Sequence, residues 1–131
     1  DSANRHLDVK IKLNPVEAIL QGKKVVVVDD SIVRGTTSVQ TVQMLREAGA
    51  KEVLMYIASP PFIKTCYYGI DTAGSDHLLA ANRTMKEIRE YIGADHLAYI
   101  SLEGLLTAVG LRQNQVCTAC FTGDYPHQQK G

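Results

Sequence analysis

Four successive valines followed by two acids, Val25-Val26-Val27-Val28-Asp29-Asp30, constrain the fold of this chain more than any other feature. Such a β-branched run suits a strand buried on both faces, as in a parallel sheet. Val39, Val42 and Leu45 then recur at helical spacing, and a second β-rich run covers residues 53–58. A strand, a helix and a strand joined by short turns form a βαβ unit with parallel strands. The predicted fold class is therefore α/β, with a parallel sheet flanked by helices.

The remaining sequence predicts further elements around that unit. A short helix begins at Asn14-Pro15 and ends near Leu20, because Asn is a good N-cap and Pro is tolerated in the first helical turn. The later elements are a helix opened by a capping box at Thr84, a strand at 97–100 and a helix at 101–109. We divide the single domain, 1–131, into a βαβ core at about 12–58, a cysteine-bearing region at about 59–126 and a tail at 127–131.

Charge and hydropathy exclude several classes of protein. The 131 residues carry 14 basic and 14 acidic side chains, and the net charge of zero argues against nucleic-acid binding. No apolar run approaches the roughly 20 residues of a membrane helix, so we expect no membrane association. Residues 1–6 lack the apolar region of a signal peptide. We therefore expect a cytoplasmic protein.

The segment after the valine run has the parts of a phosphate site. Asp29 and Asp30 end a strand, where α/β sheets bind their ligands, and a turn leads from there to a helix start. The residues of that turn with small or hydroxyl side chains are Ser31, Gly35, Thr36, Thr37 and Ser38. Free amides and hydroxyls at a helix start bind phosphate. Two acids beside a phosphate make sense if they bind sugar hydroxyls, Mg²⁺ or both.

Two other interpretations compete with a phosphate site. The acids could simply cap the next helix, with the Gly-Thr-Thr-Ser stretch as an ordinary turn. A strand ending in Asp-Asp also opens the receiver domains of signalling proteins, which need a third aspartate at the end of a later strand. Here the later strands are followed by Ser59 and Ser101, which disfavours a receiver domain.

The three cysteines, Cys66, Cys117 and Cys120, suggest a metal site that lacks one ligand in this chain. An odd number fits a disulfide framework poorly, and stable disulfides are rare in the cytosol. The C-x-x-C spacing of the last two lets both thiolates reach one centre, and it serves zinc, iron–sulfur and redox sites alike. Three small buried residues without a metal are the remaining alternative.

Several segments together resemble the amidophosphoribosyltransferase family. Residues 29–38 resemble its phosphoribosyl pyrophosphate motif, and Ile57-Ala58-Ser59-Pro60-Pro61, residues 66–71 and residues 117–126 resemble further segments in the same order. The turn after Asp71 departs from the family, which has a proline there. The resemblance implies the latter half of a type I phosphoribosyltransferase domain.

The resemblance also implies roles for the residues of the phosphate segment. Asp29 and Asp30 would bind ribose hydroxyls and Mg²⁺, and Ser31 belongs to the same motif. Gly35, Thr36, Thr37 and Ser38 would surround the 5-phosphate of phosphoribosyl pyrophosphate. In the branch of the family with an iron–sulfur cluster, Cys66, Cys117 and Cys120 match three of the four ligands of a [4Fe–4S] centre, and the fourth would lie outside this chain.

The implied activity is the formation of 5-phosphoribosylamine from phosphoribosyl pyrophosphate and glutamine, the first step of purine synthesis. The glutaminase domain and the first strands of the transferase domain are missing from this chain, so we expect it to be inactive alone, with no catalytic residue of its own. Implied partners are the rest of the same enzyme, further copies in a homo-oligomer, and purine nucleotides as inhibitors. Two other functions stay open: a nucleotide-binding module without catalysis, and a structural piece that carries a cluster.

Overall fold

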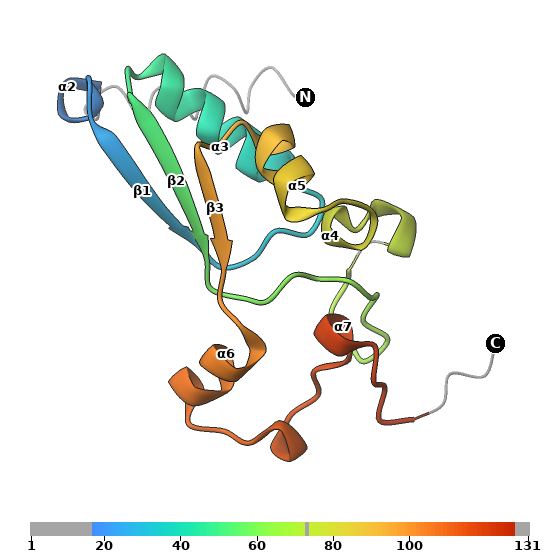
Figure 1. Ribbon diagram of the computed structural model, residues 1–131. Coiled ribbons are helices and arrows are strands. Elements are labelled where there is room, and N and C mark those ends of the chain that lie inside the picture. Colours follow the sequence, from blue (N-terminus) through green and yellow to red (C-terminus); the bar gives the residue numbers. More distant parts are fainter. Residues whose placement is uncertain (1–16, 73, 128–131) are drawn as a thin grey trace.

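A parallel sheet of three strands forms the centre of the computed structural model, which describes residues 17–72 and 74–127 (Figure 1). The strands are β1 (Lys24–Asp29), β2 (Glu52–Ile57) and β3 (His96–Tyr99), in the order β1-β2-β3. Asp29 pairs with Ile57, and Ile57 pairs with Tyr99, so the three strands end level with one another. The predicted α/β class and the parallel βαβ unit are therefore confirmed.

The helices of the described residues are α2 (Glu17–Leu20), α3 (Thr36–Glu47), α4 (Leu79–Asn82), α5 (Met85–Ile92), α6 (Leu102–Val109) and α7 (Ala119–Thr122), with 3₁₀ turns at Ser75–His77 and Gln113–Gln115. Two of the helices, α5 and α6, begin at side-chain caps that the sequence predicts. At the start of α5, the Thr84 hydroxyl accepts from the Glu87 amide and the Glu87 carboxylate accepts from the Thr84 amide, which is the predicted capping box. The helices α4 and α7 were not predicted. The predicted helix start at Asn14 and most of the predicted tail lie outside the described residues.

One face of the sheet is covered and the other is bare. Figure 1 shows α3 and α5 together on the covered face, where Val53 and Met55 of β2 are fully buried beneath them. On the opposite face the side chains of Val26 and Val28 are 58% and 74% exposed, and Tyr56 is 41% exposed. The expectation that the valine run is buried on both faces is wrong for this structure. A run of valines shows that both faces of a strand are apolar enough to be buried. Among the described residues, helices cover only one face of the sheet.

The connections between strands explain why both helices lie on the same face. The strand order advances in one direction from β1 to β3, and parallel crossovers are almost always right-handed, so successive connecting helices fall on the same side. In doubly wound sheets the second layer comes from strands beyond the first strand, where the order reverses. Among the described residues, no strand pairs with the outer edge of β1, and the face with Val26 and Val28 is exposed.

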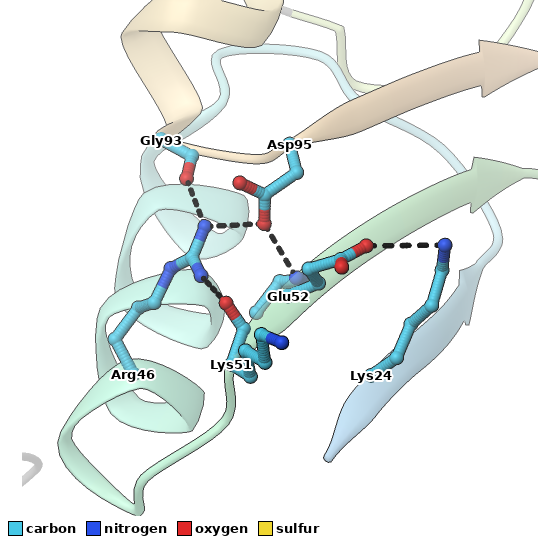
Figure 2. Close-up of polar contacts among 7 residues, drawn as sticks. Lys24, Arg46, Lys51, Glu52, Gly93 and Asp95 are labelled. Carbon is cyan, nitrogen blue, oxygen red and sulfur yellow. Dashed lines mark hydrogen bonds and ion pairs between the residues drawn. The ribbon is translucent and has the colours of Figure 1, made fainter. Parts of the chain in front are cut away.

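A polar network closes the sheet at the end opposite to the carboxyl ends of the strands (Figure 2). Arg46 at the end of α3 donates to Asp95 Oδ2 at 2.5 Å and to the Lys51 carbonyl at 2.9 Å. Asp95 Oδ2 also accepts from the Val53 amide at 2.7 Å. One guanidinium and one carboxylate thus join α3, the start of β2 and the loop before β3, while a separate pair, Lys24–Glu52, links β1 to β2.

This network contributes stability that depends on pH. The Val53 amide and the Arg46 guanidinium hold the pKa of Asp95 below its ordinary value, against a smaller opposing effect of burial. A depressed folded-state pKa stabilises the fold above the unfolded pKa, and this stabilisation is lost as pH falls through the folded pKa. Because the pair is partly exposed, at 34% and 43% of the two side chains, its contribution is about 1 kcal/mol or less.

None of the helices in the described residues has the length and apolar character that crossing a membrane requires.

Candidate functional site

The two acids lie at the carboxyl end of β1, on the edge of the sheet where the sequence placed them. The Asp30 amide donates to Asp29 Oδ1 at 2.9 Å, and the Ser31 hydroxyl donates to Asp30 Oδ1 at 3.0 Å. Asp30 is exposed and Asp29 is half-buried. Each carboxylate accepts a hydrogen bond from the next residue along the chain, and carboxylate oxygens suit the binding of hydroxyl groups or of a hydrated cation.

The start of α3 presents amides and hydroxyls at the end of the loop that follows. Gly35 is the N-cap and adopts a left-handed conformation with φ of 80°, and the Val39 amide donates to its carbonyl at 2.9 Å. The amides of the three residues between them, 36–38, therefore precede the first helical hydrogen bond. Thr36 and Thr37 are exposed, while Ser38 is only 2% exposed. The two threonine hydroxyls are thus open to a ligand, whereas Ser38 is part of the core.

An open cavity of about 460 Å³ lies over this helix start. It is lined by residues 32–38 together with Asp71, and its volume falls in the range of small-molecule sites. The structure thus brings Gly35, Thr36, Thr37 and Ser38 to one cavity, and Asp29, Asp30 and Ser31 lie at the adjoining strand end without lining it. Sequence reasoning missed Asp71 as a wall residue. The only signal was its position in a segment resembling the family.

The loop that carries Gly35 is supported from below by α4 and α5. A Cβ atom at Gly35 would lie 2.7 Å from Leu79 Cδ2 and 3.1 Å from Tyr91 Cε1, so a side chain has no room there. The Leu79 amide also donates to the Val33 carbonyl at 2.8 Å. Glycine therefore meets two requirements at this position, a left-handed backbone and a close approach to Leu79 and Tyr91.

The cysteine-bearing segments lie side by side, although about fifty residues separate them in the sequence. The amides of Ile63 and Lys64 both donate to the Cys120 carbonyl, at 3.0 and 3.1 Å. The rings of Phe62 and Phe121 meet edge-to-face with centroids 4.9 Å apart. Two hydrogen bonds and an aromatic pair therefore hold α7 against the segment that leads to Cys66. These contacts were not predicted, because residues 117–131 show no clear periodicity.

The thiol of Cys120 is influenced by the other two cysteines. Cys66 and Cys120 are half-buried, Cys117 is exposed, and none of the three forms a disulfide. Burial raises the pKa of the Cys120 thiol, and the neighbouring thiols of Cys66 and Cys117 raise it further. The Tyr68 amide donates to Cys66 Sγ at 3.4 Å. The cysteine site thus contains thiols from two segments of the chain, and a backbone amide donates to the sulfur atom of Cys66.

The thiols do not form the compact group that a single metal ion needs. Within residues 17–72 and 74–127, no three His, Cys, Asp or Glu side chains are placed to hold one ion. A four-iron cluster holds its thiolates farther apart than a single ion does, since each sulfur binds a different iron. The chemistry of the donor set, three thiols on two neighbouring segments, is that of either kind of centre.

Comparison with known proteins gives concordant results in sequence and structure. No protein-family model matches the chain. The chain is 58% identical over 122 residues to amidophosphoribosyltransferase 2, chloroplastic, of Arabidopsis thaliana, covering 93% of this chain and 22% of that protein. It is 54% identical to the amidophosphoribosyltransferase of Methanocaldococcus jannaschii, with coverage of 93% and 26%. For the Bacillus subtilis amidophosphoribosyltransferase the identity is 51%, with coverage of 95% and 27%.

Solved structures agree with these relatives. The chain superimposes on the Bacillus subtilis glutamine phosphoribosylpyrophosphate amidotransferase in complex with ADP and GMP with a TM-score of 0.79 and 52% identity, over 85% of this chain and 25% of that one. Sheet, helices and loop are those of a phosphoribosyltransferase-type domain. The chain belongs to the amidophosphoribosyltransferase family. It spans about a quarter of the length of these relatives, between 22% and 27%.

Proposed function

We propose that this chain forms the part of an amidophosphoribosyltransferase that binds the ribose 5-phosphate moiety of phosphoribosyl pyrophosphate. The observation that carries the proposal is the cavity over the start of α3, with the exposed hydroxyls of Thr36 and Thr37 beside amides that precede the helical ladder. The helix dipole adds a partial positive charge at the same place. Within the full-length enzyme, the ligand would be the substrate that ammonia from glutamine converts to 5-phosphoribosylamine, in purine synthesis.

The residues at this site contribute binding and orientation rather than proton transfer. The helix start holds the phosphate, and Asp29 and Asp30 at the end of β1 bind ribose hydroxyls and Mg²⁺. Two adjacent carboxylates are enough for Mg²⁺, which keeps several waters and takes its other ligands from the substrate. The ion neutralises charge on the pyrophosphate when it is bound. No side chain of this chain is assigned to glutamine hydrolysis.

Titration with phosphoribosyl pyrophosphate, with and without Mg²⁺, tests the proposed site. We expect weak binding that Mg²⁺ strengthens, because carboxylates next to a polyphosphate repel it unless a cation intervenes. In the Asp29→Asn/Asp30→Asn variant the Mg²⁺ dependence should be lost, while the start of α3 still takes a simple phosphate. The matched control is Asp124→Asn, an exposed acid near the cysteines. Absence of binding by the parent chain in calorimetry would contradict the proposal.

The rest of the enzyme is the partner best supported by the fold. The relatives are several times longer than this chain, and the bare face with Val26, Val28 and Tyr56 has apolar surface for a second layer. Purine nucleotides are proposed as inhibitors that occupy the same cavity, in line with the neighbour structure that contains ADP and GMP. Assembly into a homo-oligomer and a cytoplasmic location stay predictions. Several plant relatives are described as chloroplastic.

For the cysteines we propose a [4Fe–4S] cluster whose fourth ligand lies outside this chain. The support is the contact between the segment that leads to Cys66 and α7, which brings thiols from two distant parts of the sequence to neighbouring segments. These thiols would provide three corner ligands, and the cluster would supply a rigid link between the segment at Cys66 and α7. A structural piece without substrate binding remains the alternative function, and binding measurements on the phosphate cavity separate it from the proposed one.

Anaerobic reconstitution with iron and sulfide tests the cluster. We expect broad visible absorbance with iron and sulfide in equal amounts, and rapid loss in air, because three protein thiolates leave one iron without a protein ligand. Cys117→Ser should lower the yield strongly. A stable complex with a single zinc ion, or an unchanged yield in Cys117→Ser, would contradict the cluster.

A further inference from the structure

Aromatic side chains gather around the two cysteine segments without a role in the phosphate cavity. The ring of Tyr125 lies 5.3 Å from the ring of Tyr67 and 6.3 Å from the ring of Tyr68, measured between centroids. Tyr67 and Tyr68 directly follow Cys66, whereas Tyr125 follows α7. The three tyrosine rings therefore connect the two segments that carry the thiols.

Tyr125 adds a side-chain hydrogen bond between these segments. Its hydroxyl donates to the Thr65 carbonyl at 2.7 Å, a short and direct hydrogen bond to the residue before Cys66. The side chain is half-buried, although Tyr125 lies near the end of the described chain. Burial raises the pKa of Tyr125, and the neighbouring Tyr67, Cys120 and Cys66 raise it further.

A second contact holds the chain that follows Tyr125 in the same place. The His127 amide donates to the Tyr68 hydroxyl at 3.3 Å, and the two rings meet edge-to-face with centroids 6.5 Å apart. Because Tyr68 also donates its amide to Cys66 Sγ, the residues after α7 fold back over the loop of Cys66. The residues after α7 are thus tied to the loop that carries the half-buried Cys66.

We propose that Tyr125 is a positioning residue for the cysteine site: its hydroxyl and its ring hold the Cys66 segment against the chain that follows α7, so that the half-buried thiols open to water and dioxygen less often. These contacts of Tyr125 with Thr65 and Tyr67 are called the Tyr125 clasp below. The contacts of Tyr125 do not depend on a cluster. The expected effect on cluster loss rests on the proposed cluster. Groups around the ligands of a metal centre set ligand orientation and solvent access, and both affect how fast a cluster is lost.

Two substitutions separate the hydroxyl from the ring. Tyr125→Phe removes the bond to Thr65 and keeps the ring, and Tyr125→Leu removes both. After anaerobic reconstitution of the whole chain, Tyr125→Phe should lose its visible absorbance in air roughly two- to tenfold faster than the parent, the range expected for one hydrogen bond. Tyr125→Leu should lose it faster still. The matched control is Tyr56→Phe, which removes a phenol hydroxyl on the bare face of the sheet and should behave as the parent does.

Thiol alkylation of the metal-free chain tests the Tyr125 clasp independently of any cluster. Mass spectrometry after timed exposure to iodoacetamide gives a rate for each cysteine. Tyr125→Phe should raise the rate at the half-buried Cys66 roughly two- to tenfold, since loss of one hydrogen bond makes local opening that much more frequent. The exposed Cys117 serves as an internal reference and should react at the parental rate.

Cluster loss in air and thiol alkylation together show whether a failure lies with the Tyr125 clasp or with the proposed cluster. If the parent chain assembles no cluster but Tyr125→Phe still exposes Cys66, the Tyr125 clasp stands and the proposed cluster fails. If alkylation of Cys66 is the same in the parent, Tyr125→Phe and Tyr125→Leu, the inference is overturned. It is likewise overturned if a cluster forms and both variants lose it at the parental rate.

Discussion

Replacing Thr36 and Thr37 by valine is expected to weaken binding of phosphoribosyl pyrophosphate roughly a hundredfold to ten-thousandfold. Each hydroxyl that donates to a charged phosphate contributes about 1.5–3 kcal/mol, and about 1.4 kcal/mol corresponds to a factor of ten. Valine preserves the shape of threonine, and both side chains are exposed, so the fold should be little affected. Isothermal titration calorimetry at fixed Mg²⁺ and salt gives the affinities.

Thr107→Val is the matched control for this double variant. Thr107 is an exposed threonine on α6, a helix that lies beyond the carboxyl ends of the strands and does not line the cavity (Figure 1). Its replacement removes a hydroxyl of the same kind and should leave the affinity unchanged. Equal affinities for the parent and the Thr36→Val/Thr37→Val variant would show that the start of α3 does not hold the phosphate.

Gly35→Ala is expected to destabilise the fold by roughly 2–5 kcal/mol and to abolish phosphate binding. The left-handed backbone, with φ of 80°, costs an alanine about 1–2 kcal/mol. The added Cβ would lie 2.7 Å from Leu79 Cδ2, and forcing a methyl group into a packed site costs roughly 1–3 kcal/mol more. Urea denaturation followed by circular dichroism gives the change in the free energy of unfolding.

Two further variants separate the backbone contribution from the packing contribution. Gly110 ends α6 with φ of 69°, and a Cβ added there would have no neighbouring atom within 4 Å, so Gly110→Ala should show the backbone cost alone. In a double-mutant cycle, Leu79→Ala should recover part of the cost of Gly35→Ala, since it removes the atom that clashes. A Gly35→Ala variant no less stable than Gly110→Ala would show that the packing against Leu79 is unimportant.

The sequence was sufficient for the features that depend on neighbouring residues. The valine run, the helical spacing after it and the capping box at Thr84 predicted the parallel unit and α5 correctly, because strand propensity and helix capping act over a few residues. The sequence also predicted that Gly35 to Ser38 open a helix beside a strand end. The ligand roles of these residues stay predictions, since no ligand contact is described.

Features that depend on distant residues were not accessible from the sequence. Asp71 reaches the phosphate cavity from a loop that follows β2, and no pattern along the chain reports such an approach. The hydrogen bond between Tyr125 and Thr65 joins residues sixty positions apart. The burial of the valine run was misjudged for a related reason: a strand buries its second face only where another layer packs on it, and the described residues provide none.

The sequence by itself determined the order of the three strands and of the helices α3, α5 and α6 between and after them, the position of the phosphate loop and the resemblance to a family, because these depend on local patterns of residues. Only the tertiary structure decided which face of the sheet is covered, why position 35 has no space for a side chain, and how the three thiols come together. Those outcomes arise from packing and hydrogen bonds between segments far apart in the chain, where the free energy of each contact depends on where its partner lies.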